Sequence, residues 1–175
     1  MTLRLLNQKF FYITYKRLSL LFDDSLHLLF KKEYVINSEI EKVWSFLTDI
    51  KMVTDCIPYL EGLQIESPTK FIGKIKPPYS FIRGKFNINS EIEKVQEKER
   101  LKIIVKGSSI GSSFEITMHV VILPVEGTMI QLDVEVKTFG LLKPLPKSLI
   151  YKAVDDIEKL MLSSIKERLE DKSFY

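Results

Sequence analysis

Strict alternation of apolar and polar residues in two long runs constrains the fold of this chain more than any other feature. The runs cover residues 113–123 and 129–139. One face of the two runs together carries the aliphatic and aromatic positions Phe114, Ile116, Met118, Val120, Ile122, Ile130, Leu132, Val134 and Val136. Successive side chains of a strand point to opposite faces, so each run predicts a strand with one apolar face. Such strands are typical of an antiparallel sheet covered on one side only.

A long amphipathic segment near the C-terminus provides a cover for the apolar face. Lys147–Leu169 follows two prolines and predicts a helix with one stripe formed by Ile150, Val154, Ile157, Leu160, Met161, Ser164 and Ile165. A helix of this length measures roughly 35 Å, and a strand of about 11 residues measures ~37 Å. We therefore expect the helix to lie along the sheet.

The remaining elements complete an α+β fold. Further strands are expected at 28–36, 62–66, 71–76, 80–95 and 101–107. Ser38 and Glu41 offer a capping box for a first short helix, and a second helical turn, 49–57, ends before Pro58. The predicted fold class is a helix-grip arrangement, in which a curved antiparallel sheet of about seven strands wraps around a long C-terminal helix, with two short helices after the first strand.

Residues 1–25 form an N-terminal extension that precedes the domain expected over residues 26–175. Aromatic and basic residues crowd together in the extension, and neither strand nor helix periodicity fits all of it. It could pack on the domain, which we favour, or be an upstream extension with little role. A basic, aromatic segment could also lie on a membrane surface.

Composition narrows the function classes. The chain has 175 residues, 45% of them hydrophobic, and its net charge of +3 is too small to indicate nucleic acid. Lys74, Lys76, Arg83 and Lys85 are expected on outward strand faces without the stacking aromatics that nucleic acid requires. A single cysteine rules out an intrachain disulfide, and no leader or membrane-spanning run is evident. A cytoplasmic protein without a nucleic-acid partner is expected.

The sequence contains no residue pattern that indicates a metal site or a phosphate-binding loop. His27, His119 and Cys56 do not stand at metal-ligand spacing, so neither a metal nor a cofactor is expected. The glycine-rich stretch 107–111 lacks the lysine and helix start of a phosphate loop. No catalytic residue is assigned. The polar candidates that remain are Tyr34, Tyr79, Tyr151, Asp155 and Asp156.

The order of elements resembles the START-like, pollen-allergen-like helix-grip superfamily (SRPBCC). Within it, residues 28–170 are similar to the carbon monoxide dehydrogenase G-subunit family, also described as polyketide cyclase-like. The residues that carry this resemblance are Glu39–Leu47 with Val43-Trp44, Asp49, Cys56-Ile57-Pro58, Gly107, Gly111, Gly127-Thr128 and Phe139-Gly140-Leu141-Leu142. One departure is Tyr59, where the family's turn continues from proline into glycine.

The resemblance implies non-catalytic binding of a hydrophobic small molecule, lipid- or quinone-like. It further implies an accessory role in assembling a molybdenum-hydroxylase-type dehydrogenase or recruiting it to the membrane. Peripheral contact with the inner face of the membrane would follow. The alternatives are a polyketide cyclase- or aromatase-like enzyme and a general lipid-transfer protein.

On this frame, inward-facing residues would line a ligand pocket. The candidates are Trp44, Met52, Cys56, Phe71, Phe86, Phe114, Met118, Phe139, Leu142, Tyr151, Val154 and Met161. Aromatic and thioether side chains suit irregular apolar ligands, although each residue could equally be plain core. The turn 49–59 and the loop 139–146 would flank the opening.

Overall fold

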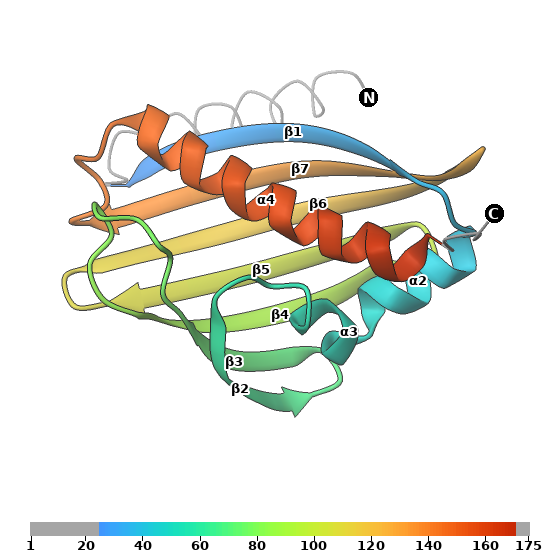
Figure 1. The fold of residues 1–175 in the computed structure, drawn as a ribbon, viewed down its shortest axis with the longest axis horizontal. Coiled ribbons are helices and arrows are strands. Elements are labelled where there is room, and N and C mark those ends of the chain that lie inside the picture. Colours follow the sequence, from blue (N-terminus) through green and yellow to red (C-terminus); the bar gives the residue numbers. More distant parts are fainter. Residues whose placement is uncertain (1–24, 171–175) are drawn as a thin grey trace, which may run out of the picture.

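The computed structural model describes residues 25–170 and consists of one curved antiparallel sheet crossed on one face by a long helix (Figure 1). The elements, in chain order, are β1 (Leu26–Ile36), α2 (Ile40–Thr48), α3 (Ile50–Thr54), β2 (Leu60–Ser67), β3 (Lys70–Ile75), β4 (Phe86–Gln96), β5 (Arg100–Ser109), β6 (Ser112–Val125), β7 (Gly127–Gly140) and α4 (Lys147–Leu169). The predicted fold class is confirmed. Almost all of the N-terminal extension lies outside the described residues.

The seven strands are ordered β1-β7-β6-β5-β4-β3-β2. Strands β2 to β7 follow one another as hairpins, and β1 pairs with β7 from Leu26 opposite Thr138 to Ile36 opposite Thr128. The first strand is therefore held at the edge by the last, with β2 forming the opposite edge.

The two faces of the sheet differ as the alternation predicts. On the inner face, which is turned toward α4, Leu28, Val136 and Ile116 lie side by side in register. The outer face carries cross-strand ion pairs, such as Lys106 with Glu115 at 3.6 Å and Lys31 with Asp133 at 3.3 Å. Exposed pairs of this kind contribute little stability, so burial of the inner face holds the sheet and helix together.

Buried apolar side chains form two separate clusters. The main cluster consists of Ile36, Val43, Trp44, Phe46, Ile50, Cys56, Phe71, Phe86, Ile88, Ile92, Leu101, Val120, Ile122, Ile130, Leu142 and Leu169. The edge cluster consists of Leu28, Phe30, Val136 and Ile150. Helix α4 contributes Leu169 to the first and Ile150 to the second, so both of its ends are anchored.

The helix α4 has the predicted bounds, but its predicted stripe needs one correction. Leu160 is 48% exposed, whereas Leu162 packs against the main cluster. At 3.6 residues per turn, the stripe that starts at Ile150 and Val154 drifts past Leu160 toward Leu162 and Ile165.

The expected capping box at Ser38 and Glu41 is wrong. Helix α2 begins at Ile40 with Glu39 at its N-cap, and no side chain caps it. The backbone of Ser38 is instead tied to the sheet, because its carbonyl accepts from Thr128 Oγ1 at 2.7 Å. A side-chain cap occurs at α3, where Asp49 accepts from the amides of Lys51 at 2.9 Å and Met52 at 3.2 Å.

The strand expected at 80–95 begins only at Phe86, and residues 76–85 form a loop. Pro77 and Pro78 lack the amide hydrogen that a strand ladder needs, which ends β3 and delays β4. As a result, Lys76, Arg83 and Lys85 lie in this loop and not on a strand face.

Candidate functional site

Between α4 and the sheet, three inward-facing apolar side chains lie outside both buried clusters. Met118 on the inner face of β6 and Ile157 and Met161 on α4 are only half-buried, and they belong to neither apolar cluster nor to the residues packed against one. Protein interiors are close-packed, so inward-facing apolar side chains that remain accessible indicate room between the layers. The ends of α4 therefore lie in buried clusters, and partly accessible apolar side chains lie between them.

Most of the predicted pocket residues lie in the two apolar clusters or pack against them. Trp44, Cys56, Phe71, Phe86 and Leu142 are buried in the main cluster, and Phe114 packs against it. Val154 packs against the edge cluster. Met118 and Met161 face the same layer between helix and sheet but belong to neither cluster and stay partly accessible.

Three of the predicted residues lie elsewhere. Met52 is 45% exposed on α3, and Tyr151 is 40% exposed, with its ring edge-on to Phe30 at 5.0 Å. Phe139 pairs with Ser113 and therefore lies on the outer face, because its neighbour Thr138 is on the inner face opposite Phe114. The expected inward orientation of Phe139 is thus corrected by the parity of the strand.

A polar group of side chains borders the space along β1. Lys32 and Tyr34 interrupt the apolar inner face, opposite Leu132 and Ile130 in register. The Lys32 ammonium lies 3.1 Å from Asp155 and 3.3 Å from Glu158, both on α4. The Tyr34 hydroxyl donates to Glu158.

These contacts shift the acidity of the groups. Burial raises the pKa of the Tyr34 phenol well above its usual value, and the hydrogen bond to Glu158 raises it further. The hydrogen bond to Asp155 raises the pKa of the Lys32 ammonium. At neutral pH, this border therefore holds a lysine cation and an un-ionised phenol, each in contact with an acidic side chain of α4.

The loop 76–85 borders the space from the other side. The Tyr79 hydroxyl donates to Asp156 of α4 at 3.1 Å, and the Tyr79 ring stacks on Phe81 at 5.3 Å. Burial, with this hydrogen bond, raises the pKa of Tyr79 to about 12. Because a strand was predicted over residues 80–95, this loop was not recognised from the sequence. The pair Pro77-Pro78 is the sequence signal that could have indicated it.

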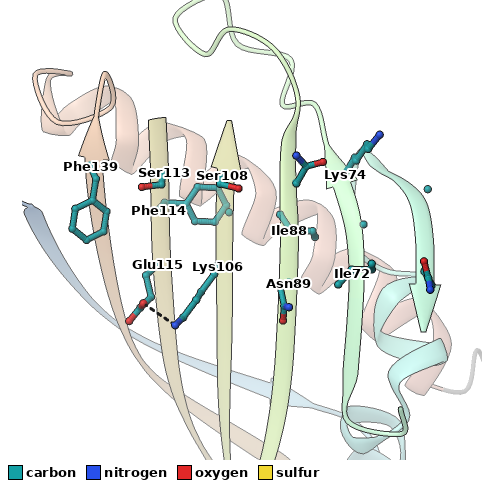
Figure 2. A pocket seen from close by; sticks show the side chains of 15 residues that line it. Ile72, Lys74, Ile88, Asn89, Lys106, Ser108, Ser113, Phe114, Glu115 and Phe139 are labelled. Carbon is teal, nitrogen blue, oxygen red and sulfur yellow. Dashed lines mark ion pairs between the residues drawn. The ribbon is translucent and has the colours of Figure 1, made fainter. Parts of the chain in front are cut away.

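A groove of about 680 Å³ lies on the outer face, away from α4. Figure 2 shows Phe139, Asn89 and the ion pair of Lys106 with Glu115 on this side, with the helix behind the strands. Phe114 and Phe139 are the predicted pocket residues that line it. Asn89 and Lys106 are exposed, so an apolar ligand would lose little contact with water here.

Within residues 25–170, the structure brings together neither a metal-binding cluster nor a cysteine–histidine pair. No group of three or more histidines, cysteines or acidic residues stands close enough there to hold a metal ion. Cys56 is buried and its thiol points to the Met52 carbonyl at 3.5 Å, whereas His119 is exposed on the outer face. Within the same residues, no helix has the length and apolar character needed to cross a bilayer.

The sheet, the crossing helix and the apolar space between them define a helix-grip protein of the START-like class. The chain belongs to the carbon monoxide dehydrogenase G-subunit (CoxG) family, whose model matches residues 33–170. A comparison with curated proteins gave no significant match.

Solved structures show the same fold at low sequence identity. A conserved protein from Geobacillus kaustophilus is 14% identical, with a TM-score of 0.73 over 81% of this chain and 95% of that one. A START superfamily protein from Mycobacterium smegmatis is 15% identical, with a TM-score of 0.62 over 83% and 98%. The di-domain ARO/CYC BexL from the BE-7585A biosynthetic pathway is 13% identical, with a TM-score of 0.59 over 84% and 51%.

Proposed function

We propose that this protein is a non-catalytic carrier of a hydrophobic small molecule, lipid- or quinone-like, held between α4 and the sheet. The observation that carries the proposal is the partial accessibility of Met118, Ile157 and Met161, apolar side chains that face one another between helix and sheet and join neither buried cluster. A ligand there would remove apolar surface from water, at about 25 cal/mol per Å². Thioether side chains adapt to irregular, flexible ligands, which suits an isoprenoid or acyl chain.

The carrier would serve a molybdenum-hydroxylase-type dehydrogenase, in its assembly or its recruitment to the membrane. Membership of the CoxG family, which is named for carbon monoxide dehydrogenase, supports this partner. A lipophilic electron acceptor partitions into the bilayer, so an enzyme beside the bilayer benefits from an apolar carrier. The proposed location is the cytoplasm, peripheral to the inner face of the membrane.

Native mass spectrometry of the full chain, purified under mild conditions, tests the carrier role. A co-purified isoprenoid quinone supports the quinone carrier, and a phospholipid supports lipid transfer. Ile157→Trp should fill the space and lower ligand occupancy about tenfold. Leu160→Trp is the matched control because Leu160 is 48% exposed on the same helix. Equal occupancy in Ile157→Trp, or wild-type protein without any apolar ligand, contradicts the proposal.

A cyclase- or aromatase-like enzyme is a second candidate, favoured by the polar border along β1. Tyr34 with Glu158 is a proton donor and acceptor pair beside an apolar space, which is what positioned acid–base catalysis on a folded chain requires. This reading is favoured if the protein purifies empty and cyclises a polyketide thioester. Tyr34→Phe should then abolish cyclisation while retaining substrate binding.

A further inference from the structure

Three connections come together at one end of the sheet, at the left of Figure 1. They are loop 76–85 between β3 and β4, turn 109–112 between β5 and β6, and segment 140–147 leading into α4. The amide of Leu141 donates to the Gly111 carbonyl at 2.9 Å. A Cβ at Gly84 would lie 3.5 Å from the Ser109 hydroxyl. These three segments therefore form one continuous surface, which we call the loop tip.

Two aliphatic side chains project from the loop tip. Ile110 is 97% exposed and Leu141 is 69% exposed. They belong to adjacent segments, because a Cβ at Gly111, the residue after Ile110, would lie 3.2 Å from Leu141 Cδ1. Single exposed aliphatic residues are common on protein surfaces, but two on neighbouring loops form a small protruding apolar patch.

The charge of the loop tip has one sign. The three segments contain no aspartate or glutamate, and they carry the basic residues Lys76, Arg83, Lys85, Lys143 and Lys147. Of these, Lys85 forms an ion pair with Glu61 of β2.

We propose that the loop tip docks on an anionic lipid bilayer. Ile110 and Leu141 insert between the headgroups, and the surrounding basic side chains face the lipid phosphates. Apolar insertion and attraction to anionic lipid together give stable interfacial binding that neither provides alone. The charge complementarity favours a lipid surface of this kind over a neutral one.

This geometry would place the border of the ligand space at the membrane. Tyr79 belongs to the loop tip and bonds Asp156 of α4, so the connection between loop and helix lies at the docked end. The proposal deepens the membrane-recruitment part of the proposed function and rests on it. It does not require a bound ligand, so the two ideas can fail separately.

Co-sedimentation of the full chain with vesicles tests the docking. Vesicles of phosphatidylcholine and phosphatidylglycerol should retain the protein, vesicles of phosphatidylcholine alone should retain much less, and added salt should weaken binding. The double variant Ile110→Ser/Leu141→Ser should lower the partition coefficient about tenfold. The pair Arg83→Gln/Lys143→Gln should lower it by a similar factor.

The matched control is Leu29→Ser, because Leu29 is 74% exposed on β1 and lies outside the loop tip. It should bind vesicles as the wild type does, and circular dichroism should show all variants folded. Ile157→Trp should also bind normally, since it blocks the ligand space only. Absence of wild-type binding overturns the proposal. The proposal is also overturned if the Ile110→Ser/Leu141→Ser variant binds vesicles as strongly as the wild type does. It is likewise overturned if Leu29→Ser loses as much vesicle binding as that double variant.

Discussion

Individual polar side chains add to the apolar contacts that hold α4 against the sheet. Lys32 and Tyr34 link the helix to β1, and Tyr79 links it to the loop 76–85. Because these residues flank an apolar space, each hydrogen bond also determines how readily the helix can separate from that side. Their ionisation states should therefore be visible in the stability of the whole chain.

Tyr79 predicts a loss of stability at high pH. Its pKa rises from the usual 10.0 to about 12 in the folded chain, chiefly through burial. A raised pKa stabilises the fold below pH 10, and this contribution is lost as pH rises from about 10 to 12. Chemical denaturation across this range should show the free energy of unfolding falling less steeply in Tyr79→Phe than in the wild type. A wild-type slope in Tyr79→Phe contradicts the assignment.

At the scale of elements, the two short helices show that similar capping residues in the sequence can behave differently in the structure. Ser38 and Asp49 both precede a helical stretch and both carry a side chain that can cap. Only Asp49 does so, since the backbone of Ser38 is drawn to the sheet by Thr128. A neighbouring strand outweighs the local preference for a cap.

Removing each side chain should separate the two cases. Asp49→Ala should lower the free energy of unfolding by about 1 kcal/mol, because the amides of Lys51 and Met52 lose their acceptor. Ser38→Ala should change it by less than about 0.5 kcal/mol. Urea denaturation of both variants measures the difference. A larger decrease in the free energy of unfolding for Ser38→Ala would indicate that the Ser38 side chain does cap α2.

The strands and helices also show how far local pattern reaches. Alternation predicted β6, β7 and their apolar face, and the prolines before residue 147 placed the start of α4 correctly. The same rule failed at 80–95, where a run of suitable residues hid the effect of Pro77 and Pro78. Phe139 was misassigned because its residue type suggested burial while its position in the strand pointed outward.

At the scale of the whole molecule, a bound apolar ligand should stabilise the fold by mass action. Decylubiquinone at about 100 times its Kd should add ~2.7 kcal/mol, which corresponds to a rise in Tm of roughly 5–10 °C for a domain of this size. Thermal unfolding followed by circular dichroism measures this rise. Ile157→Trp should lose it, and Leu160→Trp should keep it. If the wild type shows no rise, a quinone-like ligand is contradicted.

The candidate site was less predictable than the fold. Met118 and Met161 were predicted to face inward, but composition cannot separate a pocket residue from a core residue such as Phe71 or Phe86. That distinction depends on whether side chains of the helix and the sheet are in contact, which the curvature of the sheet and the position of the helix determine.

By itself, the sequence determined most of the strands, which face of the sheet is apolar, and where α4 begins and ends. These properties follow from periods of two and 3.6 residues, which backbone geometry sets locally. Only the tertiary structure decided that two apolar clusters stay apart, that Tyr34 meets Glu158 across the fold, and that Ile110 and Leu141 project together from the loop tip. Such contacts depend on register and packing between residues far apart in the chain, and no local pattern encodes those distances.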